Sequence, residues 1–383
     1  MVMQCKKIKS RLAAGWYFMQ GDEACAEGAI AAGCRFYAGY PITPASEIMI
    51  RMVQRLPEVD GVFIQMEDEI GSISSVIGAT WAGAKAMTAT SGPGISLMTE
   101  SIGYAVITET PCLIVDVQRA GPSTGQATRP AQGDMMMVKW GAHGDNEIVA
   151  FSPWSVQEMY DLTIKSFNFA ERFRVPAFLL ADEAVGHLRE TLVIKEEVEV
   201  FDRVKIPGQP PFGTEEINGV PQMPAFGEGA NLLVTGSTHD SWGFRKTQDS
   251  ATQARLTERL VRKVRDFKSE IVATDSHLLE DAEIGVVAYG FTARAALQAV
   301  KTLRKEGIKA GLLRLISIWP FADEAISELG QRCRVIFVPE MNRGQVAGEM
   351  KKYTPTPIIS LPKTNGEVIE PAEIVEGIHR SVT

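Results

Sequence analysis

The sequence is poor in cysteine and has no long apolar run, and each absence excludes a class of protein. Its 383 residues contain five cysteines, and no two of them have the spacing of a metal or redox pair. We therefore expect no disulfide, no structural zinc, no iron–sulfur cluster held by this chain alone, and a cytoplasmic location. No apolar run reaches the roughly 18 residues of a membrane span, and the first fifteen residues lack the apolar stretch of a secretory signal.

Positive charge is not in excess either. The formal net charge is −8, and no large cluster of lysine and arginine appears, so we expect no nucleic-acid partner. The short basic run Arg262, Lys263 and Arg265 is expected to be a solvated helix face. Hydrophobic residues make up 45% of the chain and charged residues 22%, which is typical of a globular protein with a sizeable core.

Several catalytic motifs are also missing. The chain has no GxxxxGK phosphate loop and no GxGxxG after a predicted strand. Its five histidines are scattered and no pair has metal-ligand spacing, so we expect no metal site. The missing glycine fingerprint disfavours a dinucleotide-binding protein of similar topology.

Apolar strands alternate with helical segments along the chain, which predicts an α/β fold with a doubly wound, mostly parallel sheet. We expect this sheet in residues 17–190, after an N-terminal tail at 1–16 that is frayed or contacts a partner. A charged, Pro- and Gly-rich linker follows at 191–230, and then a second α/β domain at 231–383. The predicted strands cover residues 34–38, 62–66, 85–90, 112–117, 148–151 and 175–181 in the first domain and 231–235, 284–289, 309–315 and 335–338 in the second.

The stretch from residue 66 to residue 94 is the most informative part of the chain. It begins with three acids, Glu67, Asp68 and Glu69, and continues with small and apolar residues at helical spacing. A helix with no charged face is typical of the protein interior. We therefore expect these acids at the N-terminus of a buried helix, where the helix dipole favours carboxylates. Either all three only cap the helix, or one of them is a catalytic carboxylate.

Two further polar residues lie at predicted strand ends in the same domain. Thr43 belongs to the turn GYPITP, and Arg119 heads a long loop over 119–133 that is rich in Gly, Pro, Ser and Thr. Strand ends in a doubly wound sheet converge on one crevice. A hydroxyl, a buried carboxylate and an always-charged bidentate donor suit a cofactor with a ring nitrogen and a substrate with a carboxylate. The simpler interpretations are an N-cap for Thr43, which can do both jobs, and a surface salt bridge for Arg119.

Several segments of the chain resemble one known family. They are GYPITPASE (39–47), QMEDEIGSISSVIGA (65–79), ATSGPG (89–94), TPCLIVDVQRAGPSTGQ (110–126), TRPAQGD (128–134), the DE-VGH segment at 182–187 and VPEMNRGQ (338–345). Together they are similar to the α subunit of the 2-oxoacid:ferredoxin oxidoreductases, and the similarity covers about residues 17–350. The loop GPSTGQATRPAQGD looks most like the 2-oxoglutarate branch, that is, 2-oxoglutarate synthase.

The resemblance implies a concrete activity and a set of partners. Members of the family use thiamine diphosphate for the oxidative decarboxylation of a 2-oxoacid, with CoA as acyl acceptor and ferredoxin as electron acceptor. This chain would supply the pyrimidine-binding domain and a domain like the transketolase C-terminal domain. A β subunit would supply the domain for the diphosphate and Mg²⁺, together with a [4Fe-4S] cluster. Separate γ and small ferredoxin-like δ subunits are also expected.

The resemblance also implies roles for individual residues. Glu69 would hydrogen-bond the aminopyrimidine ring and share a proton with its ring nitrogen, which drives the imino tautomer. A dry, apolar wall strengthens such sharing. Glu67 and Asp68 would then be caps, and Thr43 and Arg119 match positions that hold the 2-oxoacid carboxylate. The residues matched to cofactor binding are Tyr40, Pro41, Ile42, Thr43, Glu69 and Gly92.

The expected substrate, 2-oxoglutarate, carries a second carboxylate that needs a second cation. Arg129 or His143 could supply it from their positions in or after the long loop. The expected reaction converts 2-oxoglutarate and CoA to succinyl-CoA and CO₂ and reduces ferredoxin. Two alternatives stay open, namely the same chemistry on branched-chain 2-oxoacids or pyruvate, and a non-catalytic scaffold paralogue that keeps the fold.

Overall fold

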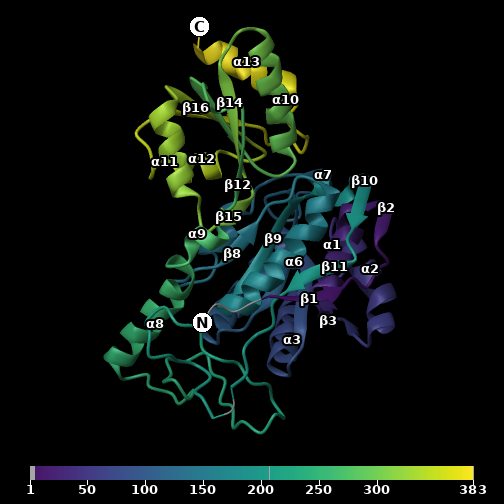
Figure 1. The fold of residues 1–383 in the computed structure, drawn as a ribbon, viewed down its shortest axis with the longest axis vertical. Coiled ribbons are helices and arrows are strands. Elements are labelled where there is room, and N and C mark those ends of the chain that lie inside the picture. Colours follow the sequence, from purple (N-terminus) through teal and green to yellow (C-terminus); the bar gives the residue numbers. More distant parts are fainter. Residues whose placement is uncertain (1–4, 207, 383) are drawn as a thin grey trace.

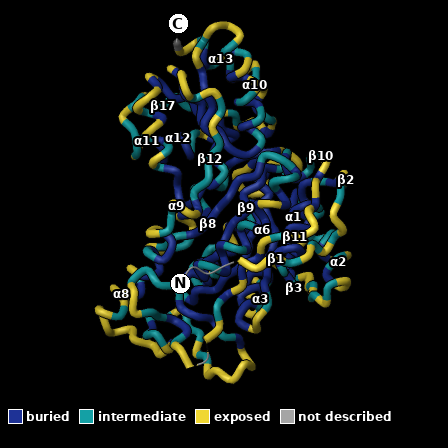
Figure 2. Tube along the Cα trace, viewed as in Figure 1, coloured by how far each residue is buried: buried dark blue, intermediate teal, exposed yellow. Residues whose placement is uncertain are grey.

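Two β-sheets, each flanked by helices, lie one above the other and are linked by a long, largely irregular segment (Figure 1). The computed structural model describes residues 5–206 and 208–382, so residues 1–4 of the predicted tail and residue 207 of the predicted linker lie outside the described part. The central strands of both sheets are buried, whereas the first turns of α8 (Ser250–Arg265) and the loops beside it are largely exposed (Figure 2). Within the described residues, no helix is both long enough and apolar enough to cross a membrane.

The larger sheet is doubly wound and mostly parallel, as predicted. Its neighbouring strands are parallel except at one edge, where β15 runs antiparallel to β8, and β7 adds an antiparallel pairing to β6. Figure 1 shows this sheet in the middle of the molecule. In spatial order the strands are β15 (Ser317–Trp319), β8 (Val149–Phe151), β9 (Pro176–Asp182), β6 (Cys112–Ala120), β5 (Lys85–Thr90), β3 (Cys34–Gly39) and β4 (Val62–Gln65), with β7 at Gln126–Pro130.

Helices cover both faces of this sheet, because successive side chains of its buried strands point to opposite sides. Leu113 and Val115 of β6 belong to one apolar core, and Cys112 and Ile114 belong to another. The first core includes α1 (Gly21–Ala31), α2 (Ser46–Arg55) and α6 (Val156–Phe173), and the second includes α3 (Glu69–Trp81) and α4 (Gly92–Ile107).

The smaller sheet has four parallel strands and one antiparallel edge strand. Helices α10 and α13 pack together against one side of it. Its strands are β12 (Thr274–His277), β14 (Ala310–Leu315), β13 (Ile284–Ala288), β16 (Val335–Glu340) and β17 (Ile358–Pro362), and its helices are α10 (Thr292–Lys305), α11 (Asp323–Arg332), α12 (Gln345–Met350) and α13 (Pro371–Val382).

The side chain of Gln132 joins the two sheets. Its Nε2 donates to the backbone oxygen of Tyr289 at 3.0 Å, and its Oε1 accepts from the backbone N of Met341 at 3.1 Å. The side chain of Asn342 donates to the backbone oxygen of Gln132 at 2.6 Å. The segments TRPAQGD and VPEMNRGQ therefore meet at the contact between the sheets.

The prediction of a frayed tail is wrong for the described residues between 6 and 16. Strand β1 (Lys6–Lys9) pairs antiparallel with β11 (Glu197–Val200), and β2 (Gly15–Gln20) pairs with β10 (Arg189–Ile194). The charged sequence at 191–200, which looks like linker, supplies the partner strands. The pairing satisfies backbone groups that a frayed tail would leave to water.

The predicted strand at 231–235 is also wrong. These residues have no regular structure, and Leu232 and Val234 pack against the core under α3 and α4 instead of entering a sheet. The helices α8 and α9 (Lys268–Ile271) follow, and the first strand of the smaller sheet begins only at residue 274. We therefore propose a domain boundary near residue 272, in place of the one expected at 231.

A buried ion cluster connects α8 to the larger sheet. Lys263 belongs to this cluster, so the prediction that the basic run is a solvated helix face is wrong for Lys263. The Glu109 carboxylate, which is fully buried, accepts from Arg259 at 2.6 and 2.7 Å and from Lys263 at 2.8 Å. Arg174 lies in the same cluster and donates to the backbone oxygen of Glu109 at 3.0 Å. Burial would raise the pKa of the Glu109 carboxyl, but the charges of Arg259 and Lys263 outweigh burial and hold that pKa well below its ordinary value.

Replacing Glu109 by glutamine is expected to destabilise the protein by about 3–5 kcal/mol, because Arg259 and Lys263 would stay buried without a counter-charge. Since the folded pKa is depressed, this stabilisation is present above the unfolded pKa of about 4.3 and is lost as the pH falls toward the folded value. Urea unfolding at pH 7 measures the loss.

The matched control is Glu283→Gln, which removes an exposed carboxylate 3.0 Å from Lys309. It is expected to cost less than about 1 kcal/mol. Equal losses for the two variants would contradict the role given to the buried cluster.

Candidate active site

The order of the strands creates a crevice where the conspicuous motifs meet. Strand β3 lies between β4 and β5, so the chain moves to one side of β3 and then crosses to the other. Ligands of open α/β sheets bind outside the carboxyl ends of the strands at such a switch point. The turn GYPITP follows β3, and the segment SGPG follows β5. Glu69 comes four residues after β4.

Glu69 is the first residue of α3, and its side chain is only 4% exposed. A Cβ on Gly94, in the first turn of α4, would lie 2.7 Å from both Cγ and Oε1 of Glu69 and closer still to Oγ1 of Thr90. Only glycine lets the two helices approach this closely. Asp68 is the N-cap of α3, as expected, because its Oδ1 accepts from the backbone N of Gly71 at 2.7 Å. The two neighbouring acids therefore have different environments, one capping and one buried.

Helix α3 is not buried on all sides, contrary to expectation. Ile73, Val76 and Ile77 face the core, but Ile70, Ser74, Gly78 and Ala82 are exposed. No charged residue stands on this exposed face. Within the described residues nothing lies within 4 Å of a Cβ placed on Gly78. The uncharged pattern, which is typical of an interior helix, therefore marks a face that this chain leaves open.

Arg119 and Thr43 lie in direct contact. Nη1 of Arg119 donates to the backbone oxygen of Thr43 at 2.8 Å. Arg119 is 9% exposed, and its Nε is buried without a hydrogen-bond partner, so it is not a surface salt bridge. Arg119 also belongs to β6 and does not head a loop, because β7 continues the pairing there.

The turn GYPITP presents several of the residues matched to cofactor binding. Tyr40 and Pro41 are exposed, and Ile42 and Thr43 are half-buried. Thr43 does not cap α2, which begins at Ser46 with Ala45 as its N-cap. The Thr43 hydroxyl is therefore not committed to helix capping.

Three polar residues near the ends of β5 and β6 were missed in the sequence. Asp116 and Gln118 are buried on β6, and Asp134, which is half-buried, precedes α5 (Met135–Trp140). A Cβ on Gly92 would lie 2.9 Å from Oδ2 of Asp134, and the backbone N of Asp134 donates to Gln118 at 3.1 Å. The sequence feature that could have revealed Asp116 is its position as a carboxylate within the apolar run LIVDV.

The carboxyls of Asp116 and Asp134 titrate as a pair. Burial, followed by the charge of Asp134, raises the pKa of Asp116 well above its ordinary value. Burial also raises the pKa of Asp134 to about 6, although the neighbouring carboxyl of Asp116 and the charge of Arg119 oppose that rise. Burial therefore favours the protonated form of both carboxyls.

The two candidates for a second substrate cation lie in different places. Arg129 is an exposed residue of β7, one position before Pro130, which pairs with Arg119. His143 is 84% exposed and lies 3.7 Å from Glu100 on α4. Arg129 is therefore connected to the Arg119 region through strand pairing, whereas His143 lies on an outer surface of α4.

A cavity of about 530 Å³ lies at the opposite end of the same sheet. Gly33 and Lys85, which stand at the amino ends of β3 and β5, contribute to its wall together with Lys6 and Asp202. The cavity is therefore distinct from the crevice at the carboxyl ends of the strands, where the motifs lie.

Comparisons with known proteins agree with this geometry. The family model described as "Pyruvate flavodoxin/ferredoxin oxidoreductase, thiamine diP-bdg" matches residues 27–259, and "Pyruvate:ferredoxin oxidoreductase core domain II" matches residues 282–374. The chain is 49% identical to the 2-oxoglutarate synthase subunit KorA of Methanocaldococcus jannaschii, over 94% of this chain and 98% of the relative. It is 37% identical to the ketoisovalerate oxidoreductase subunit VorB of Methanothermobacter thermautotrophicus, over 94% and 96%.

Solved structures show the same relationship. The 2-oxoglutarate:ferredoxin oxidoreductase from Magnetococcus marinus, with 2-oxoglutarate, coenzyme A and succinyl-CoA bound, superposes with a TM-score of 0.88 at 31% identity. The match covers 96% of this chain and 65% of that one. A split-gene transketolase matches with a TM-score of 0.54 at 13% identity, which shows a shared fold alone. The chain thus belongs to the family of 2-oxoacid:ferredoxin oxidoreductase α subunits, with a domain of the thiamine-diphosphate-binding type.

Proposed function

We propose that this chain is the α subunit of a 2-oxoglutarate synthase, which converts 2-oxoglutarate and CoA to succinyl-CoA and CO₂ and passes the electrons to ferredoxin. The observation that carries the proposal is the buried carboxylate of Glu69, held against Gly94 where α3 and α4 begin. Relatives named 2-oxoglutarate synthase are 44–49% identical to this chain, whereas those named ketoisovalerate oxidoreductase are 36–37% identical. That difference favours 2-oxoglutarate over branched-chain substrates.

Glu69 is suited to hold a proton opposite a ring nitrogen. When bound, thiamine diphosphate supplies the carbon nucleophile and the electron sink that decarboxylation needs. The side chain of Glu69 lies in a dry wall formed by Gly94 and Thr90, where a shared proton is not lost to water. The same wall fixes the position of the carboxylate, so little reorganisation is needed for the proton to move.

Arg119 is suited to hold the 2-oxoacid carboxylate. One of its guanidinium nitrogens is engaged by the backbone oxygen of Thr43, while Nε is buried with a free donor. A guanidinium presents several donors in a fixed plane and binds carboxylates strongly. We assign the carboxylate next to the ketone to Arg119, with the Thr43 hydroxyl beside it.

We assign the distal carboxylate of 2-oxoglutarate to Arg129 in preference to His143. Strand β7 places Arg129 one residue from the position opposite Arg119. Gly366 lies next to it, since a Cβ there would be 3.0 Å from Cβ of Arg129. His143, beside Glu100, lacks such a connection to Arg119.

A partner must complete the site. Several apolar side chains in the segments next to Glu69 are exposed, with Tyr40, Val62, Ile64 and Ile70 between 39% and 50% exposed. Exposed apolar patches of this kind mark protein interfaces. We propose that a β subunit covers them and brings Mg²⁺, the diphosphate site and a [4Fe-4S] cluster, with separate γ and δ subunits in the same complex. The five free cysteines fit a reducing cytoplasm.

The Glu69→Gln variant tests the proposed function in the complex assembled with the β subunit. We expect kcat for methyl viologen reduction by 2-oxoglutarate plus CoA to fall by about 10²–10⁴-fold, because glutamine cannot exchange the proton. The control is Glu67→Gln, which neutralises an exposed acid two residues earlier and should keep activity within about twofold of the unchanged complex. A Glu69→Gln complex with most of its activity would refute the assignment.

The substrate assignment is tested by Arg129→Ala. We expect KM for 2-oxoglutarate to rise about 10–100-fold relative to KM for 2-oxobutyrate, which lacks the second carboxylate, because one charge-assisted hydrogen bond is lost. Arg380→Ala, at the surface of α13, serves as the matched control. An unchanged ratio for Arg129→Ala would rule Arg129 out, and a change with His143→Ala would transfer the role to His143.

A further inference from the structure

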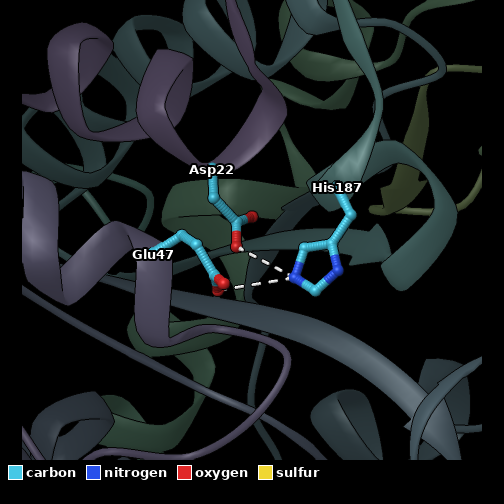
Figure 3. Close-up of side chains that lie close together, drawn as sticks. All are labelled: Asp22, Glu47 and His187. Atoms are coloured by element: carbon cyan, nitrogen blue, oxygen red, sulfur yellow. Dashed lines mark ion pairs between the residues drawn. The ribbon is translucent and has the colours of Figure 1, made fainter.

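A histidine and two carboxylates from three separate helices meet beside the GYPITP turn. They are Asp22 in the first turn of α1, Glu47 in the first turn of α2, and His187 at the end of α7 (Glu183–His187). Figure 3 shows the three side chains pointing toward one another. One ligand-type atom from each lies within 4.8 Å of the other two. The site is separate from Glu69 and Arg119, and nothing above assigns it a role.

Asp22 has the environment of a ligand that lacks its partner. Its side chain is completely buried, and neither carboxylate oxygen has a hydrogen-bond partner in the part of the chain that is described. Its carboxylate points into the cluster (Figure 3). Burying a carboxylate without hydrogen bonds is costly unless a cation compensates it.

The distances around His187 match the coordination sphere of a small divalent cation. Its Nε2 lies 3.4 Å from Oε2 of Glu47 and 4.0 Å from Oδ2 of Asp22. The backbone oxygen of Pro44 is 3.1 Å from the same nitrogen. Ligands that each lie about 2.1 Å from one ion are at most about 4.2 Å apart, so all three separations fit a shared centre.

The other ring nitrogen of His187 has the partner that metal-ligating histidines usually have. Its Nδ1 lies 3.2 Å from Oε1 of Glu183. A carboxylate at this position fixes the tautomer whose opposite nitrogen can coordinate once an ion replaces the proton between Nε2 and the Pro44 carbonyl. Three carboxylates thus surround one imidazole, and the nearby Arg189 is directed to Glu23 at 3.5 Å. The cluster has an excess of negative charge that favours a cation.

We propose that Asp22, Glu47 and His187 bind one divalent transition-metal cation, of the Zn²⁺ or Mn²⁺ type, with the Pro44 carbonyl as a fourth ligand and Glu183 as the orienting carboxylate. A mixed set of imidazole and carboxylate ligands suits these ions better than Mg²⁺ or Ca²⁺, which prefer oxygen alone. The sequence shows no ligand spacing because the ligands come from positions 22, 44, 47 and 187. The ion would tie α1, α2 and α7 to the residue that follows Thr43.

Anomalous diffraction tests the proposal at the level of single atoms. Crystals of the assembled complex are soaked in ZnCl₂ or MnCl₂, and data are collected on both sides of the metal edge. We expect a peak about 2.1 Å from His187 Nε2 and close to the carboxylates of Asp22 and Glu47, and no such peak in Asp22→Asn crystals. A map with metal only at other positions, and Nε2 of His187 still on the Pro44 carbonyl, would overturn the proposal.

A solution measurement covers the case in which Asp22→Asn fails to fold. The affinity of the complex for Zn²⁺ is measured by competition with a chromophoric chelator. We expect the half-exposed variant Glu47→Gln to abolish one tight site, and Glu183→Gln to weaken it about 10–100-fold. The matched control is Glu100→Gln, which removes a carboxylate next to the exposed His143 and should leave Zn²⁺ affinity and stoichiometry unchanged. Equal effects of Glu47→Gln and Glu100→Gln would refute a built site.

Discussion

No side-chain carbon fits at Gly94, and this steric limit organises the candidate active site. Helix α4 begins so close to Glu69 and Thr90 that a Cβ would overlap both. The carboxylate is therefore packed against the backbone of α4, and the start of α4 cannot move away without opening the core beneath it. Two helix N-termini, each favouring negative charge, are held at the switch point of the sheet. A fixed carboxylate in a dry wall is what proton sharing with a ring requires.

In two clusters away from this crevice, buried charges are matched one against another. Glu109 is paired with Arg259 and Lys263, and Glu171 with Arg203 at 2.7 Å. Around the crevice the balance is different, because buried polar atoms without partners gather at the ends of β5 and β6. They belong to Thr88, Ser91, Asp116, Gln118, Arg119 and Asp134. Native proteins seldom leave such atoms unsatisfied unless a site needs them, so this group of atoms supports a ligand site at the crevice.

Local patterns in the sequence were enough for the six parallel strands of the larger sheet and for the cap at Asp68, but not for β7, β15 or the cap of α2. The strand at 85–90 and the cap at Asp68 follow from alternation and capping chemistry, because neighbouring residues alone decide them. The wrong predictions concern positions whose environment is set by residues far away in the sequence. Lys263 looks solvated until Glu109 is placed beside it, and residues 231–235 look like a strand until α4 supplies the surface on which they pack. Asp116 was missed because one acid in an apolar strand gains meaning only next to Asp134.

The open face of α3 is the strongest physical argument that one chain makes only half of the site. A helix without charged residues gains little from facing water, yet Ile70, Ser74 and Gly78 are exposed here. The edge strand β4 beside it exposes Val62 and Ile64 and has no partner on its outer side among the described strands. An apolar edge of this kind invites association unless it is covered. Because Glu69 lies at the start of the same helix, whatever covers this face also forms the missing wall around its carboxylate. In the proposed function, assembly and proton sharing would therefore depend on the same surface.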